Sequence, residues 1–348
     1  MRRHTRILTA LVTATATAAA LALAATGASA GTRLAGATLP RYVFAPYFET
    51  YDTSGDLATL SQQSGAKYLA LAFLQTAQAG SCTAYWDGNT SEPIAQSSFG
   101  SDIATIQAAG GNVIPSFGGY SADTTGTDIA DSCTNVAAIA QVYESVITTY
   151  HVPRIDLDIE ANSLTNTAGV NRRNEAVAQT EAWAAAHGRK IQFSYTMPST
   201  TTGMTSSEEA VIQNAIADGA TIGVVNLMTF DYYIGTKQEM GVDTKTAATA
   251  GHSQLQALYP GKTSAQLWHM IGITEMPGID DFGADETFTM VNANRVLSWA
   301  GHAGISTLSF WALQRDNGGC PGTKGAGTCS GITQPTWWFS HTFEPFTR

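Results

Sequence analysis

Three carboxylates alternate with apolar residues in the stretch 152–160, which reads Val-Pro-Arg-Ile-Asp-Leu-Asp-Ile-Glu. This alternation is typical of a β-strand, whose successive side chains point to opposite faces. Asp156, Asp158 and Glu160 therefore share one face. Like charges held this close repel one another, and their burial is costly unless one carboxyl is protonated or paired. In a chain with only 13% charged residues, this strand indicates the reacting centre of a hydrolase.

Eight short apolar runs, separated by helical patterns, predict the elements that position this strand. They lie at residues 42–47, 68–74, 112–117, 152–160, 190–197, 223–230, 267–274 and 305–311. Near-continuous apolar strands that alternate with helices favour a parallel sheet covered by helices. Eight such units predict an α/β fold, a single (β/α)8 TIM barrel formed by residues 31–348. No Gly-x-Gly-x-x-Gly follows the first strand, which argues against an open nucleotide-binding sheet.

Polar and aromatic residues stand at the ends of several predicted strands, where the active site of such a barrel lies. They are Ser116, Asp156, Asp158, Glu160, Tyr195, Asp231, Tyr232, Glu275 and Trp311. Glu160 is expected nearest the open mouth and Asp156 deepest. The alternative for the acidic strand is a solvated edge with one polar face. Its Ile and Leu residues and its place in the middle of eight strands argue against that alternative.

The first thirty residues have the pattern of a secretory signal peptide. Arg2, Arg3 and Arg6 form a basic start, residues 7–25 an apolar middle, and residues 28–30 (Ala-Ser-Ala) a cleavage site. A membrane anchor is the alternative, but the apolar run is diluted by Thr and ends in small residues. We therefore expect a secreted, extracellular protein.

The charge of the chain restricts its partners. The formal net charge is −10, and removal of the three Arg of the signal leaves 15 basic against 28 acidic residues, a net charge of −13. There is no Lys/Arg-rich run, so nucleic acid and anionic membrane surfaces are poor partners. The seven His are scattered and no His-Glu-x-x-His occurs, so no metal or cofactor is expected. We expect a monomer.

Four cysteines, Cys82, Cys133, Cys320 and Cys329, predict two disulfides in a secreted chain. Three pairings are possible. We favour Cys82–Cys133 and Cys320–Cys329, because the second would close a short Gly-rich loop. Their spacing does not match a zinc site.

Motifs at four strand ends together resemble those of family 18 glycoside hydrolases, and of secreted actinobacterial chitinases in particular. The resemblance covers residues 40–348. The matches are Asp156-x-Asp158-x-Glu160 to Asp-x-x-Asp-x-Asp-x-Glu, Ser116-Phe117-Gly118-Gly119 to Ser-x-Gly-Gly, Met228-Thr229-Phe230-Asp231 to Met-x-Tyr-Asp, and Trp311 to the aromatic floor of the sugar site. Their order along the chain is that of the family.

The resemblance implies a retaining, substrate-assisted mechanism, in which the N-acetyl group of the substrate acts as the nucleophile. Glu160 would protonate the leaving oxygen, Asp158 would hydrogen-bond the acetamido N–H, and Asp156 would share a proton with Asp158. It also implies that four residues bind substrate, namely Asp231, Trp311, Met228 and Ser116. For Ser116 and the two glycines after it, a tight turn with close packing is an equal alternative, and Met228 is more often a packing residue.

Two positions depart from the family pattern. The first Asp of the long signature falls on Pro153, which lies far from the chemistry. The Tyr of Met-x-Tyr-Asp falls on Phe230, so the hydroxyl that binds the acetamido oxygen in the family is missing. Tyr232 has the same strand parity and lies one step nearer the mouth. We expect Tyr232 to replace that hydroxyl.

The predicted function is that of a secreted endo-acting chitinase, which cuts β-1,4 bonds between N-acetylglucosamine units of chitin or its oligomers. About thirty residues with one helix separate the seventh and eighth strands, which by resemblance leaves no room for a wall-forming α+β insertion. Tyr85 and Trp86 are candidates for a distal sugar subsite. An endo-β-N-acetylglucosaminidase acting on N-glycans and a catalytically silent chitin-binding barrel are the alternatives.

Overall fold

Parallel strands form a ring in the computed structural model of the chain, which describes residues 38–52 and 54–348. The signal peptide predicted for residues 1–30 lies outside these residues. Around the ring the order is β1 (Val43–Phe44), β12 (Thr307–Phe310), β9 (Ile271–Glu275), β8 (Ile222–Met228), β7 (Gln192–Pro198), β6 (Arg154–Asp158), β5 (Asn112–Gly118), β3 (Tyr68–Thr76) and β2 (Tyr47–Glu49).

The ring closes because β1 and β2 are two halves of one strand, interrupted at Ala45 and Pro46. The Ala45 N–H donates to the Leu308 carbonyl at 2.9 Å, and the Pro46 carbonyl accepts from the Ala70 N–H at 3.0 Å. The backbone hydrogen bonding therefore passes without a gap from the last strand to the second. The predicted eight-stranded barrel is confirmed.

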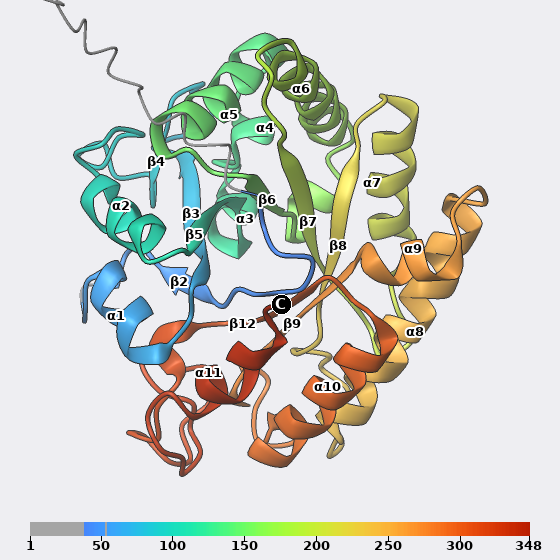
Figure 1. The fold of residues 1–348 in the computed structure, drawn as a ribbon. Helices are drawn as coiled ribbons and strands as arrows, with labels where there is room; N and C mark the ends of the chain where they lie inside the picture. Colours follow the sequence, from blue (N-terminus) through green and yellow to red (C-terminus); the bar gives the residue numbers. More distant parts are fainter. Residues whose placement is uncertain (1–37, 53) are drawn as a thin grey trace, which may run out of the picture. The chain divides into compact units, whose positions relative to one another are not determined.

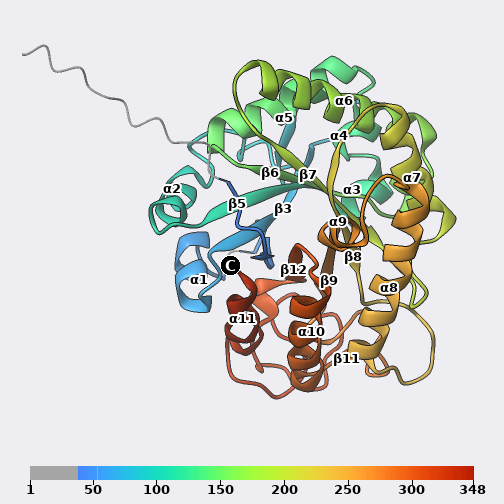
Figure 2. The same ribbon diagram turned by 45° about the vertical axis from the view of Figure 1, so that its right-hand side comes forward.

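Helices lie outside the ring and connect its strands (Figures 1 and 2). The longer ones are α1 (Leu57–Ser64), α2 (Gly100–Ala108), α5 (Val136–Tyr150), α6 (Thr167–Ala186), α7 (Ser206–Ala217), α8 (Met240–Leu258) and α10 (Met290–Ala303). The shorter ones are α3 (Tyr120–Thr125), α4 (Ile129–Ser132), α9 (Ser264–His269) and α11 (Trp338–Phe343). Within the described residues, no helix is both long and apolar enough to span a bilayer.

One predicted boundary near the end of the chain is wrong. Residues 267–270 are not strand, because Thr263 and Gln266 form a capping box that starts α9, and the buried Leu267 belongs to that helix. The one helix expected between the seventh and eighth strands is α10, which starts at Met290. A small antiparallel pair, β10 (Gly278–Ile279) and β11 (Thr287–Phe288), precedes it.

Both favoured disulfides are present. Cys82 and Cys133 tie the loop before β4 (Ala84–Trp86) to the end of α4, and Cys320 and Cys329 close the Gly-rich loop after β12. The first disulfide holds the segment that follows β3 against the segment that follows β5. Both of these segments lie near the carboxyl ends of barrel strands.

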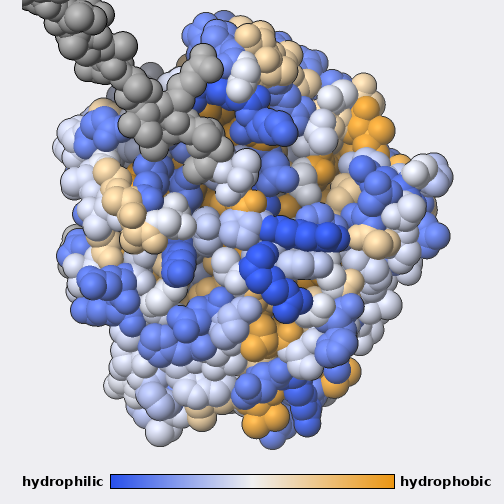
Figure 3. All heavy atoms as spheres, in the orientation of Figure 1, coloured by the Kyte–Doolittle hydropathy of each residue, from blue (hydrophilic) through white to orange (hydrophobic). Residues whose placement is uncertain are grey.

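The two faces of the barrel wall differ in polarity. Outward residues such as Ile155, Leu157 and Phe193 are buried against the helices in one large apolar cluster. Inward residues of β6 are instead Arg154, Asp156 and Asp158. On the face seen in Figure 3 hydrophilic side chains predominate and apolar ones are scattered. The polar interior is the unusual feature of this barrel, because barrel interiors are ordinarily filled by branched apolar side chains.

Candidate active site

Asp156 lies at the centre of the barrel and accepts four hydroxyl hydrogen bonds. Tyr47 and Ser116 donate to Oδ2 at 2.9 and 2.6 Å, and Ser194 and Thr196 donate to Oδ1 at 2.5 and 2.8 Å. An ionised carboxylate has about four acceptor sites, so this cradle is built for the anion. Burial raises the pKa of Asp156, and the four hydroxyl groups oppose that rise.

Asp158, one step nearer the mouth, has the opposite surroundings. It is 3% exposed, and its Oδ1 has no hydrogen-bond partner among the described residues. Burial raises its pKa well above the usual range, and the charges of Glu160 and Asp156 raise it further. The pair of aspartates therefore favours a proton on Asp158 and a negative charge on Asp156.

Glu160 follows the end of β6 and is half-buried, so the three carboxylates lie in the expected order of depth. Its backbone N–H donates to Asp123 Oδ2 on α3, which fixes the chain where the strand ends. Burial raises the pKa of Glu160 to about 7, the Tyr120 N–H opposes the rise, and the charge of Asp281 adds to it. A carboxyl group with this pKa can donate a proton near neutral pH.

A second group of carboxylates lies behind Glu160. Asp123 is buried, and burial together with Asp128 raises its pKa to about 9. Asp128 forms a buried ion pair of 3.0 Å with Arg173 of α6. None of these residues was predicted from the sequence, because no local pattern links positions so far apart. Ser194 and Thr196 face the barrel interior, as the acidic row does. Which residues of β6 they lie beside depends on the register in which β6 and β7 pair, and the sequence does not give that register.

The mouth has an aromatic wall on the side of the last strand. Trp311 follows β12, and its ring is stacked on Phe73 with centroids 5.5 Å apart and planes at 12°. Its centroid also lies 5.6 Å from that of Tyr47, which holds Asp156. Trp311 and Phe73 are half-buried. This places an aromatic surface next to the carboxylates, and the stacking of Trp311 on a sugar ring stays a prediction.

The Ser116–Gly119 motif serves close packing in this fold. Gly118 and Gly119 have φ of +95° and +83°, and a Cβ on Gly118 would lie 2.1 Å from the Asp158 carbonyl oxygen. A Cβ on Gly119 would lie 2.6 Å from the Phe73 ring. Ser116 is 0% exposed below the mouth. Of the two alternatives given for Ser116, this position favours close packing, with the hydroxyl supporting Asp156.

The residues after β8 lie at the mouth, but their contacts are with the protein. Asp231 Oδ1 accepts the N–H groups of Asp281 and Phe282 at 3.0 and 3.2 Å, so Asp231 holds the loop that carries Asp281. Burial and the charges of Asp280 and Asp281 raise its pKa to about 8. Met228 is buried, and its carbonyl accepts from Ser199.

Tyr232 has a buried hydroxyl without a hydrogen-bond partner among the described residues. Burial raises its pKa, followed by the charges of Glu275, Asp243 and Glu286. Its backbone N–H donates to Glu286 at 2.7 Å. The ring packs against the apolar cluster between the barrel and its helices, near Glu275 and the Ser199 hydroxyl, and its replacement of the hydroxyl missing at Phe230 stays a prediction.

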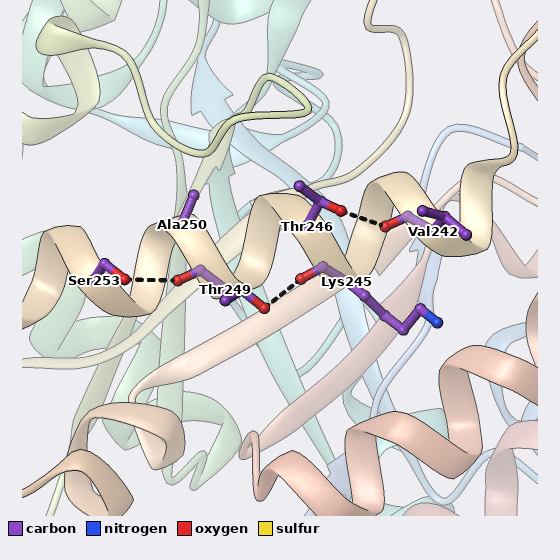
Figure 4. Close-up of a pocket in the computed structure, with 6 residues that line it drawn as sticks. All are labelled: Val242, Lys245, Thr246, Thr249, Ala250 and Ser253. Carbon is purple, nitrogen blue, oxygen red and sulfur yellow. Dashed lines mark hydrogen bonds between the residues drawn. The ribbon is translucent and has the colours of Figure 1, made fainter.

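Two other features lie outside this site. Trp86 is 1% exposed and donates to the Tyr150 hydroxyl at 3.0 Å, so its assignment to a distal subsite is wrong. A hollow of about 570 Å³ lies along one face of α8 (Figure 4), but its Thr and Ser hydroxyls bond to carbonyls of the same helix. In residues 38–52 and 54–348, no three or more His, Cys, Asp or Glu side chains are arranged so that they could hold a metal ion.

Comparison with known proteins identifies the family. Residues 43–277, two thirds of the chain, match the family described as Glycosyl hydrolases family 18. The chain belongs to glycosyl hydrolase family 18. The matched range contains the acidic row of β6 and the motifs after β5 and β8, which confirms the resemblance seen in the sequence.

Relatives of this family 18 chain include curated proteins and solved structures. It is 31% identical over 321 residues to a probable bifunctional chitinase/lysozyme of Escherichia coli, and 31% identical over 288 residues to Endochitinase 11 of Metarhizium anisopliae. These alignments span 89% and 80% of the chain but 35% and 53% of those proteins.

The catalytic domain of a hyperthermophilic chitinase from Pyrococcus furiosus superimposes with a TM-score of 0.77 at 28% identity, over 88% of this chain and 95% of that one. Catalytic-site mutants of active domain 2 of that organism's thermostable chitinase, complexed with chito-oligosaccharides, give 0.77 at 27% identity, over 89% and 96%.

Proposed function

We propose that the protein is a secreted chitinase that cuts internal β-1,4 bonds between N-acetylglucosamine units with retention. The observation that carries this proposal is the graded acidic row: Asp156 accepts four hydroxyl hydrogen bonds, Asp158 is buried with an unpartnered oxygen among the described residues, and Glu160 at the mouth has a pKa raised to about 7. Solved relatives that bind chito-oligosaccharides support the choice of substrate.

The spacing of the carboxylates supports substrate assistance. Asp158 is the last residue of β6 and Glu160 follows two residues later in extended backbone, roughly 7 Å away at the backbone. Both approach a sugar from the same side, so neither can attack the anomeric carbon from behind. The acetamido carbonyl oxygen of the substrate forms the new bond to that carbon while Glu160 protonates the departing glycosidic oxygen. Asp158 binds the acetamido N–H, and Glu160 then takes a proton from the water that opens the oxazolinium ion.

Exposed aromatic rings on the Glu160 side of the mouth support binding of the departing sugar chain. Tyr120 and Tyr233 are 66% and 62% exposed, and the Tyr233 ring packs edge-on against Phe282 at 5.2 Å. The Tyr120 N–H and the Asp281 carboxylate both act on Glu160. Only the small β10–β11 pair and α10 separate β9 from β12, which supports an open groove and internal cleavage.

Soluble chitin oligomers assayed beside a high-mannose glycoprotein would test the proposal. Internal cleavage of hexamers or longer oligomers, with the β-anomer formed first, is the expected result. Cleavage of the glycoprotein alone would replace the proposal by an endo-β-N-acetylglucosaminidase, and binding without cleavage would indicate a silent barrel. Cleavage after Ala30 in protein recovered outside the cells would test secretion, and light scattering would test the monomer that we propose.

The pH dependence should follow Glu160. Because its raised pKa of about 7 keeps the acid protonated at lower pH, kcat/KM should fall as the pH rises through about 7. Asp281→Asn removes a charge that raises this pKa, so the basic limb should move to lower pH. Asp285→Asn, an exposed carboxylate on the same loop, is the matched control. A basic limb that is identical in both variants would contradict the assignment.

Tyr232→Phe should lower kcat by about tenfold or more, because a positioned hydrogen-bond donor in such a site commonly contributes that much. The unpaired Tyr232 hydroxyl is proposed to bind the acetamido oxygen. Tyr42→Phe, whose ring packs against Phe346 away from the acidic row, is the control. Unchanged kcat in Tyr232→Phe would mean that another group positions that oxygen.

A further inference from the structure

An arginine lies buried below the acidic residues inside the barrel. Arg154 stands two residues before Asp156 on the inward face of β6 and is 3% exposed. Its Nη1 donates to Thr307 Oγ1 across the barrel at 3.0 Å, and its Nη2 donates to Gln192 Oε1 at 3.1 Å. Both partners are neutral, and none of the ion pairs in the described part of the chain includes Arg154.

The buried positive charge of Arg154 calls for a negative partner. Arginine does not lose its proton in proteins, and a buried charge without a counter-ion is costly. The next charge along the same face is Asp156, roughly 7 Å away at the backbone. Electrostatic attraction between these two groups acts through the barrel interior, where screening by water is weak.

A small cavity of about 20 Å³ lies next to both groups. Its lining includes Arg154 and Asp156 together with Tyr47, Ser194, Asn226 and Thr307. A water molecule needs roughly 10–15 Å³ and two to four polar partners, and this cavity offers both. The four hydroxyl groups already occupy the acceptor sites of Asp156, so a water here can accept from the guanidinium group and donate to Asn226 Oδ1, which has no other partner among the described residues. The Asn226 amide in turn donates to Thr196 at 2.9 Å, and Thr196 donates to Asp156.

We propose that Arg154 is a positioning residue which, by its charge and through a water molecule bound in this cavity between its guanidinium group and Asn226, holds the negative charge on Asp156 and so places the proton of the pair on Asp158. This inference rests on the proposed glycoside hydrolysis and adds to it the source of the charge order in the acidic row. It also accounts for an arginine at the base of a barrel where an apolar residue would pack at lower cost.

The other titratable groups around the Asp156–Asp158 pair are acidic or neutral, so Arg154 supplies the positive charge. Asp156 faces Tyr47 from β2 and Asp158 from β6, while β5, β7, β8 and β12 contribute Ser, Thr and Asn side chains to its surroundings. Arg154 faces Asp156 above it. Below it, burial and then the charges of Arg41 and Arg154 lower the pKa of His269, so His269 is kept neutral there.

Arg154→Met, Arg154→Lys and the parent protein should be compared over pH with a chromogenic chitobioside. Loss of the cation should raise the pKa of Asp156, whose anion is the active form. The acid limb of kcat in Arg154→Met should therefore move up by about one pH unit, which corresponds to a tenfold loss of kcat below the limb. KM should change less than twofold, and Arg154→Lys should restore most of the shift.

A folded Arg154→Met with lower thermal stability and an unmoved acid limb would overturn the proposal, because that is the signature of a purely structural arginine. Two measurements on the parent protein need no turnover. Carbon-13 titration of the aspartate carboxyls should show Asp156 ionising at lower pH than Asp158, and the reverse order would overturn the proposal. A high-resolution crystal structure should show the water, and an empty cavity would refute the bridge.

Discussion

Glu160→Gln is expected to lower kcat by about 10³-fold, equivalent to ~4 kcal/mol of transition-state stabilisation, while the affinity for chitin oligomers changes little. The amide cannot supply the proton that the leaving oxygen needs. The aromatic wall formed by Trp311 and Phe73 is unaffected, so the groove should still bind the sugar chain. Single-turnover kinetics and calorimetric titration with a chitin tetramer would separate the two effects.

Glu175→Gln is the matched control for that experiment, since Glu175 is an exposed carboxylate on α6. It should behave as the parent protein in both assays. If Glu160→Gln retained more than a tenth of the parent kcat, Glu160 would not be the acid. If it lost oligomer binding as well, its main contribution would be to the shape of the groove.

Asp158→Asn is expected to lower kcat by roughly 10²–10³-fold, because a preorganised polar group that acts on developing charge contributes about this much. The asparagine amide cannot share a proton with Asp156. Asp102→Asn on the outer helix α2 is a suitable control. A variant within threefold of the parent rate would show that Asp158 is not the partner of the acetamido group.

A substrate change tests the same step without altering the protein. Fully deacetylated glucosamine oligomers have no acetamido oxygen, so the parent protein should not turn them over. Turnover of these oligomers at a rate near that of chitin oligomers would require a nucleophile on the protein, and the substrate-assisted mechanism would fall.

The sequence predicted the barrel and the acidic row well, because both depend on local alternation. The parity of residues 155–160 is enough to separate the carboxylates from the apolar face. The same parity places Arg154 on the inward face, since it differs from Asp156 by two positions. Arg154 was nevertheless not among the predicted site residues, because a cation at the base of a barrel has no counterpart in the chemistry that the carboxylates suggest.

Other parts of the site could not be predicted, because they depend on register and on loops. Ser194 and Thr196 reach Asp156 only through the pairing of β6 with β7. Asp123 reaches the backbone of Glu160 from a short helix that begins just after the two glycines of the Ser-x-Gly-Gly motif. Trp86 was misjudged because an aromatic residue in a loop can equally well belong to the core.

The divided first strand has a consequence for the order of folding. Its backbone at Ala45 accepts from Ser309, 264 residues later, and the Phe44 N–H donates to Thr347, 303 residues later. Contacts of such long range form slowly, since the intervening chain must first be brought together. The ring therefore cannot close until almost the whole chain has been synthesised. During that interval the first strand lacks its partner on the side of β12, and the barrel stays open.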